Sequence, residues 1–167
     1  MPYSSKEAKT KMNIQKIKND IRVLYDECLE NTQPFHRKLD LFLVPEYLAN
    51  KVLKATGLDI GRHWVCIDNF GILHTLEQHG NPLSEAKRGQ IAVEKEDFAS
   101  FLDVFLDPDE IQLAGITKRT NLPLIQFIKT MGDKKIVVKE VRTIISTKKQ
   151  KLSRVVFHTM YKIKVSK

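Results

Sequence analysis

The stretch Asp68–Gly80, with the sequence DNFGILHTLEQHG, separates a part of the chain with helical patterns from a part with strand patterns. Its two histidines, His74 and His79, stand five positions apart just before Gly80. On a helix this spacing turns the second side chain about 140° away from the first. Gly80, followed by Pro82, predicts that the helix ends there. We therefore expect His79 to lie in the last turn, where it can leave the helical face and share a cleft with His74.

Upstream of this stretch, the chain alternates between helical and extended patterns. Apolar residues three and four positions apart predict one helix over residues 4–29, and Pro45 and Gly57 bracket a second over residues 46–55. Extended segments are predicted at residues 38–44 and 63–67. We expect residues 1–33 to form an N-terminal helical arm, which packs on its own domain or docks on a partner. Residues 34–167 are expected to form a single domain.

Downstream of the stretch, one more helix is expected at residues 97–106, and the apolar period then changes from helical to alternating. Four segments rich in Ile, Val, Phe and Thr follow and are predicted to be strands: residues 111–113, 124–131, 136–146 and 153–165. Helices first and strands last indicate an α+β fold. The expected architecture has N-terminal helices packed on one face of a C-terminal antiparallel sheet of about four strands.

Composition narrows the class of protein. A hydrophobic fraction of 42% in 167 residues suits one well-packed domain. No apolar run has the length of a membrane span, and the polar, lysine-rich start does not resemble a signal peptide. Cys28 and Cys66 are isolated, which favours a reducing, cytoplasmic setting. No metal site or cofactor is expected, because helical histidine ligands prefer spacings of three or four.

Charge is distributed unevenly along the chain. Residues 115–167 contain 14 Lys and Arg against 2 Asp and Glu, a net charge of +12, whereas residues 1–114 contain 14 against 18, a net charge of −4. Such a local excess is typical of a surface that binds a polyanion, and RNA is the expected partner. The alternative is a solubilising surface with lysines on exposed strands. Four basic residues are RNA-binding candidates: Arg119, Lys134, Lys139 and Lys162.

The two long C-terminal strands have apolar residues on both faces. By alternation, Glu140 and Arg142 share a face with Ile136 and Val138. In the last strand, Val155, Phe157, Thr159 and Tyr161 are expected on one face, and His158 on the opposite one. A sheet with one face under helices and the other forming a cleft explains this mixture.

Several segments, taken in order, resemble the phage-associated branch of the barnase, EndoU, colicin and RelE-like nuclease superfamily. The resemblance covers roughly residues 45–164 and is carried by residues 55–59, 67–68, the two histidines of 74–80, 93–98 ahead of Pro108-Asp109, 138–142 and 158–162. It implies a metal-independent RNA-cleaving fold, with helices on one face of an antiparallel sheet and the active site on the other.

The resemblance also implies roles for particular residues. In such enzymes a general base removes the proton of the ribose 2′-hydroxyl, and a general acid protonates the leaving oxygen. His74 and His79 match the family's histidine motif and are the acid and base candidates. Arg142 is the candidate for binding the scissile phosphate, with Thr159 and Tyr161 as hydrogen-bond donors to it. Glu140 is a candidate for orienting a histidine or acting as a base.

Each of these residues also has a structural interpretation. Histidines of a helix are often partly buried and bonded to backbone, and Glu140 with Arg142 fits an ordinary pair on a strand. Three functions therefore remain open. The first is an endoribonuclease, a toxin or effector encoded by a phage or mobile element and matched by an immunity or antitoxin protein. The others are a nucleic-acid-binding module without catalysis and a phage structural or interaction protein.

Overall fold

A computed structural model describes residues 2–31, 33–146 and 151–165 of the chain, and the side chains of 13–31, 33–144 and 152–165. Over these residues the helices are α1 (Pro2–Glu30), α2 (Glu46–Thr56), α3 (Asn69–His79), α4 (Pro82–Lys87) and α5 (Lys95–Leu106). The strands are β1 (Lys38–Leu43), β2 (Trp64–Asp68), β3 (Gln90–Ile91), β4 (Glu110–Ile116), β5 (Pro123–Met131), β6 (Lys134–Ser146) and β7 (Lys151–Lys164).

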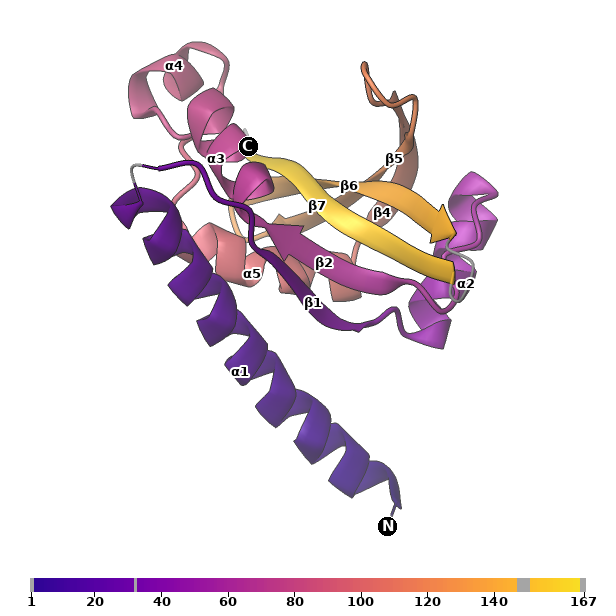
Figure 1. Ribbon diagram of the computed structural model, residues 1–167. Helices are drawn as coiled ribbons and strands as arrows, with labels where there is room; N and C mark the ends of the chain where they lie inside the picture. Colours follow the sequence, from indigo (N-terminus) through magenta and orange to yellow (C-terminus); the bar gives the residue numbers. More distant parts are fainter. Residues whose placement is uncertain (1, 32, 147–150, 166–167) are drawn as a thin grey trace.

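Within the described residues the seven strands form one sheet, ordered β1-β2-β7-β6-β5-β4, with β3 also paired to β7 (Figure 1). The α+β class predicted from the sequence is confirmed. The predicted antiparallel sheet of about four strands is wrong, because the extended segments near the N-terminus join the same sheet. Strand β2 pairs with β7 in parallel through residues 64–66 and 154–156. No local pattern predicts a pairing between segments so distant in sequence.

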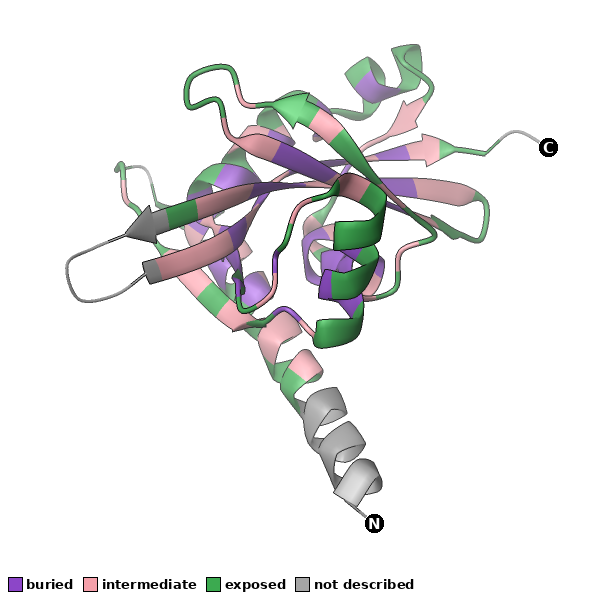
Figure 2. Cartoon of the chain, turned by 90° about the vertical axis from the view of Figure 1, so that its right-hand side faces the viewer, coloured by how far each residue is buried: buried purple, intermediate pink, exposed green. Residues whose placement is uncertain are grey.

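One face of the sheet is covered by α5. Phe98 and Phe101 pack against Phe157 of β7, and Phe105 packs against Phe127 of β5, with ring centroids 4.9–5.9 Å apart. All five rings are fully or almost fully buried. Figure 2 shows buried residues concentrated in the middle of the strands and exposed ones at their ends. The hydrophobic core therefore lies between α5 and this face of the sheet.

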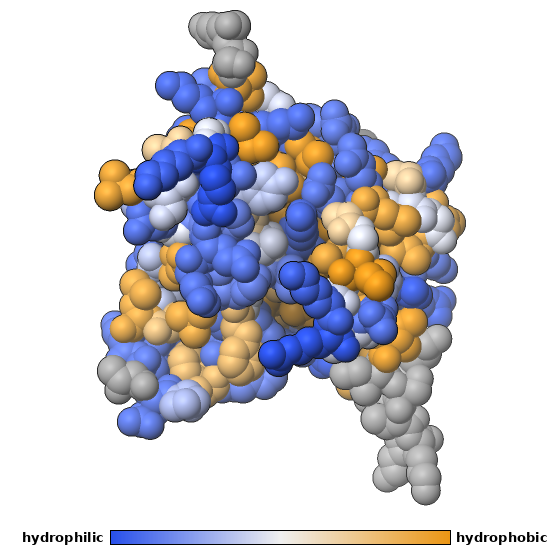
Figure 3. Space-filling view, turned by 90° about the horizontal axis from the view of Figure 1, so that it is seen from above, coloured by the Kyte–Doolittle hydropathy of each residue, from blue (hydrophilic) through white to orange (hydrophobic). Residues whose placement is uncertain are grey.

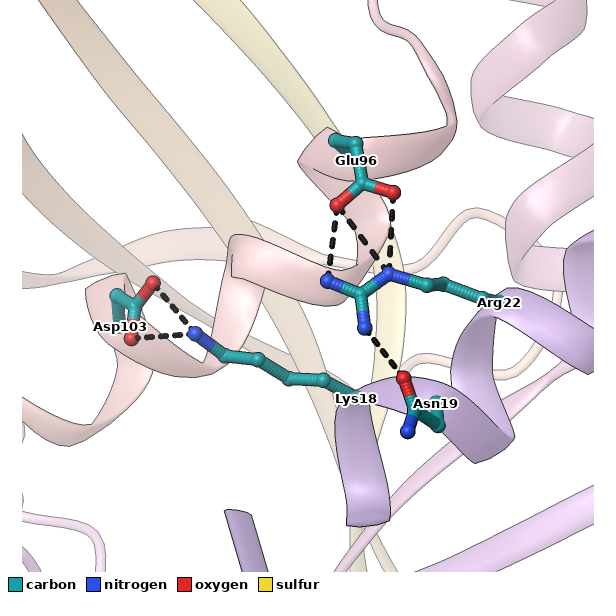
Figure 4. A network of polar contacts seen from close by, with 5 residues as sticks. All are labelled: Lys18, Asn19, Arg22, Glu96 and Asp103. Atoms are coloured by element: carbon teal, nitrogen blue, oxygen red, sulfur yellow. Dashed lines mark hydrogen bonds and ion pairs between the residues drawn. The ribbon is translucent and has the colours of Figure 1, made fainter. Parts of the chain in front are cut away.

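The described side chains of α1 attach it to the outer side of α5. Ile21 and Leu24 of α1 are buried in the core. Lys18 pairs with Asp103 at 3.1 Å and Arg22 with Glu96 at 2.9 Å, as Figure 4 shows. The C-terminal half of α1 is thus packed on its own domain, and in Figure 1 the helix leads away from the sheet toward its N-terminus.

Helix α3 lies against β7, between the stretches of that strand that pair with β2 and β3. It begins where Asp68 accepts a hydrogen bond from the backbone N–H of Gly71 at 2.9 Å, and it ends at Gly80, as the sequence predicted. A Cβ at Gly71 would stand 2.7 Å from the carbonyl oxygen of Phe157. Glycine at this position therefore permits the close approach of α3 to β7.

A β-bulge at His158 changes which residues of β7 share a face. Lys139 of β6 pairs with Thr159 and Glu140 pairs with Phe157, so His158 has no partner in the register. Phe157 and Met160 both enter the core, while Thr159 lies on the opposite face. The predicted shared face of Val155, Phe157, Thr159 and Tyr161 is therefore wrong beyond the bulge. Among the described residues, no helix is long and apolar enough to cross a membrane.

Candidate active site

Two histidines meet on the sheet face that α5 leaves open. His74 comes from the middle of α3, and His158 occupies the bulge of β7. Their ring centroids are 5.3 Å apart with an interplanar angle of 43°, and both side chains are half-buried. Because Phe157 points into the core, alternation directs the next residue, His158, to the open face and toward α3. The bulge then brings Thr159 to the same face as His158.

A basic cavity of about 640 Å³ lies on one side of the histidine pair. Its floor includes Lys139, Val141 and Thr159, and its far wall is the loop between β4 and β5, residues 117–120. That loop supplies Lys118 and Arg119. Its shape is maintained by hydrogen bonds from the backbone N–H of Leu122 to the hydroxyl of Thr117, 3.0 Å, and from Thr117 N–H to the Leu122 carbonyl, 2.9 Å.

A second cavity, of about 390 Å³, lies on the other side of the pair. Both cavities are lined by His74, Val141 and His158, so they adjoin at the histidine pair, and together they are called the cleft below. The second cavity contains fewer basic groups: Lys38, Asp68, Phe70 and Thr143 are among its lining residues. Figure 3 shows the face of the molecule seen from above, with hydrophilic residues across its middle and hydrophobic patches apart from one another.

The cleft favours an unprotonated imidazole at His158. Burial lowers the pKa of His158 below its ordinary value of 6.5, and the neighbouring His74 and Lys139 lower it further, against a smaller opposing effect of Asp68. His158 is therefore mostly neutral near pH 7 and has a lone pair that can accept a proton.

Hydroxyl groups and a lysine surround the pair. The Thr159 hydroxyl lies 3.4 Å from that of Thr75 on α3. Burial raises the pKa of Tyr161, which therefore remains protonated near neutral pH and able to donate a hydrogen bond. The Lys139 ammonium lies 5.8 Å from the centroid of the Tyr161 ring. These groups can stabilise negative charge that develops on a phosphate in the cleft.

Comparison with known proteins identifies the family of the chain. Residues 43–167, about three quarters of the chain, match the family model described as phage-Barnase-EndoU-ColicinE5/D-RelE like nuclease3. The chain belongs to this nuclease family. The membership predicted from the sequence is thus confirmed, whereas searches of curated proteins and of solved structures find no significant match.

Of the residues predicted for a nuclease site, His74, Lys139, Thr159 and Arg119 line the cleft. Tyr161 borders it through its contact with Lys139. His79 lies apart: it is buried, its Nδ1 is 3.1 Å from a carboxylate oxygen of Glu85, and its ring lies against that of Tyr161 at 5.4 Å. Glu85 also pairs with Arg88. His79 therefore supports the packing of α3, α4 and Tyr161, and does not line either cavity.

Two other predicted residues, Glu140 and Lys162, lie on the face that α5 covers. Glu140 is fully buried between Ile125 and Phe157 in the strand register, and neither carboxylate oxygen has a hydrogen-bond partner among the described residues. Burial raises its pKa well above the ordinary value. Lys162 pairs with Asp97 of α5 at 2.8 Å.

Arg142 and Lys134 also lie outside the cleft. The Arg142 guanidinium is 3.4 Å from a ring nitrogen of His63, and it lines a separate cavity near Gly61. Lys134 begins β6 opposite Lys164, outside the residues that line the two cavities. Sequence reasoning missed His158, Lys118, Lys38 and Asp68 as lining residues of the cleft. His158 was left out because alternation put it on the face opposite Thr159 and Tyr161, whereas the bulge brings Thr159 onto the face of His158.

Within the part of the chain that the structure describes, no group of three or more His, Cys, Asp or Glu side chains is arranged to hold a metal ion.

Proposed function

We propose that this protein is an endoribonuclease that cleaves RNA through attack of a ribose 2′-hydroxyl on the adjacent phosphate. The observation that carries the proposal is the pair of imidazoles, His74 and His158, at the centre of a basic cleft in a chain of a nuclease family. Two imidazoles at one phosphate can supply both a base and an acid near neutral pH.

In the proposed reaction, neutral His158 removes the proton of the 2′-hydroxyl, whose oxygen then forms a bond to phosphorus. The bond from phosphorus to the 5′-oxygen of the next nucleotide breaks, and His74 donates a proton to that oxygen. The products are a 2′,3′-cyclic phosphate and a free 5′-hydroxyl. The depressed pKa of His158 supports its role as the base.

The basic groups of the cleft are proposed to bind the substrate's phosphates. Lys139 lies beside the pair, and Lys118 and Arg119 face it from the β4–β5 loop. Thr159 and Tyr161 are proposed as hydrogen-bond donors to the phosphate as charge grows on it. Compared with the sequence-based assignment, His158 takes the place of His79, and Lys139 that of Arg142.

The test is incubation of the purified protein with total cellular RNA in excess chelator, followed by analysis of the fragment ends. Wild-type protein is expected to leave cyclic phosphates, and H158A and H74A are expected to lose cleavage. An oligonucleotide of the same sequence made of 2′-deoxynucleotides should remain intact. RNA that is bound but not cleaved would indicate a nucleic-acid-binding module, and unchanged cleavage in both variants would place the active site elsewhere.

We further propose a biological role as a toxin or effector of a phage or mobile element that acts on cytoplasmic RNA. The family's description as phage-associated supports this role. Such an activity requires an immunity or antitoxin protein in the cell that produces it. Expression of the wild type is expected to arrest growth while H158A does not, and equal growth with both would contradict the role.

A further inference from the structure

We propose that the smaller cavity beside the histidine pair is a subsite for one unpaired nucleobase of the RNA, with Phe70 as its stacking platform. This inference rests on the proposed function and deepens it by naming the class of substrate. Phe70, Asp68, Lys38 and Thr143 line the cavity together with the two histidines.

Phe70 has the exposure and support of a stacking surface. It lies in the first turn of α3, and 55% of it is exposed, although most phenylalanines of the fold are buried in the core. Its ring packs on that of His36, with centroids 5.1 Å apart and an interplanar angle of 35°. The His36 Nε2 lies 3.8 Å from one carboxylate oxygen of Asp68. The other oxygen of Asp68 accepts a hydrogen bond from the backbone N–H of Gly71. The ring of Phe70 is therefore supported by that of His36, and more than half of the residue remains open to a ligand.

The cavity combines the two kinds of surface that a nucleobase needs. Val141 and Val156 are apolar and suit the faces of a base, whereas Asp68, Lys38 and Thr143 place an acceptor and donors around its edge. Its volume of about 390 Å³ falls within the roughly 300–1,000 Å³ of small-molecule sites. The neighbouring cavity, with Lys118, Arg119 and Lys139, suits the anionic backbone instead.

The position of the cavity determines which base would occupy it. Because both cavities share His74, Val141 and His158, a strand lying along the cleft crosses the histidine pair between them. With the scissile phosphate at that pair, the base of an adjoining nucleotide reaches Phe70. Stacking on an aromatic side chain requires a base that is free of its own stack, so single-stranded segments are the expected substrate.

The kinetic test uses oligonucleotides with a single ribonucleotide in a 2′-deoxy background, in which an abasic site replaces in turn the base on each side of the cleaved bond. One of these replacements is expected to lower kcat/KM of the wild type by roughly 5- to 100-fold. F70A should lower kcat/KM for the intact oligonucleotide by a similar factor and leave the abasic one unchanged, and F70W should restore it. The matched control is L73A, an exposed apolar residue of the same helix that does not line this cavity.

A binding test separates failure of this inference from failure of the proposed function. An all-2′-deoxy oligonucleotide carrying 2-aminopurine cannot be cleaved by 2′-hydroxyl attack, so its fluorescence reports stacking alone. Quenching by the wild type and by L73A, but not by F70A, supports the subsite even if no RNA is cleaved. Equal quenching by wild type and F70A, or equal cleavage of intact and abasic substrates by the wild type, overturns it while leaving the ribonuclease activity intact.

Discussion

The two faces of the sheet use polar side chains in opposite ways. Lys139 and Glu140 are neighbours on β6, yet Lys139 lines the open cleft and Glu140 is fully buried on the face that α5 covers. On β7, His158 faces α3, and Lys162 is held against Asp97 of α5. Polar residues of the covered face therefore act on stability, whereas those of the open face are available for a ligand.

The largest expected effect is on the open face. His158→Ala should lower the rate of RNA cleavage by about 10²- to 10⁴-fold, because it removes the proposed general base. Its melting temperature should stay close to that of the wild type, since the side chain is only half-buried. Cleavage assays measure the rate, and thermal unfolding measures the melting temperature.

The variant H79A is the informative counterpart. It is expected to be destabilised through loss of the contact between His79 and Glu85. Loss of activity in H79A without loss of stability would restore His79 to the site.

Two lysines provide a matched comparison across the sheet. Lys162→Ala should lower the free energy of unfolding by about 3 kcal/mol, because it leaves Asp97 without its cation. Lys139→Ala should change stability little and weaken RNA binding. The slope of log affinity against log salt concentration should become shallower by about one. Urea unfolding measures the stability of both variants, and RNA-binding titrations at several salt concentrations measure their affinity. The distinction between the faces would fail if Lys139→Ala were the more destabilising change.

Glu140 should make stability depend on pH. Its pKa is raised in the folded protein, whereas the unfolded chain ionises near the ordinary value of 4.5. As pH rises above 4.5 the unfolded state loses the proton first, so this group lowers the free energy of unfolding until the raised pKa is reached. The expected slope is at most about 1.4 kcal/mol per pH unit. Glu140→Gln cannot ionise, so urea unfolding from pH 5 to 8 should show a shallower decline in the variant. Parallel curves would mean that Glu140 is not an isolated buried acid.

The smallest effect is expected on the surface of α1. Arg22→Ala removes an ion pair with Glu96 and should cost under about 1 kcal/mol, because the pair is exposed and screened by salt. RNA cleavage should be unchanged, since neither Arg22 nor Glu96 lines the cleft. A large loss of activity in this variant, measured with the same assay as for H158A, would show that the covered face does influence the site.

Much of the local structure could be predicted from the sequence. The ends of α3 follow from the capping carboxylate of Asp68 and the glycine at position 80, and Gly57 ends α2 with a positive φ of 78°. These features depend on interactions within a few residues, so the sequence reports them directly. The nuclease family, and His74 as a candidate residue of its site, were also visible in the order of motifs.

The composition of the site was less predictable, since it depends on contacts between distant segments. The parallel pairing of β2 with β7 places α3 beside the bulge, and the bulge decides that Thr159 joins His158 in the cleft. Alternation alone put Thr159 and Tyr161 on the core side and could not show that Glu140 would be covered by α5.

By itself, therefore, the sequence determined the α+β class, the family, the helix ends and the basic character of the C-terminal region. Only the tertiary structure decided which face each polar residue occupies and which second histidine joins His74. The physical reason is that a single bulged residue reverses the alternation of a strand, and whether a bulge forms depends on the packing of the neighbouring strands and helix.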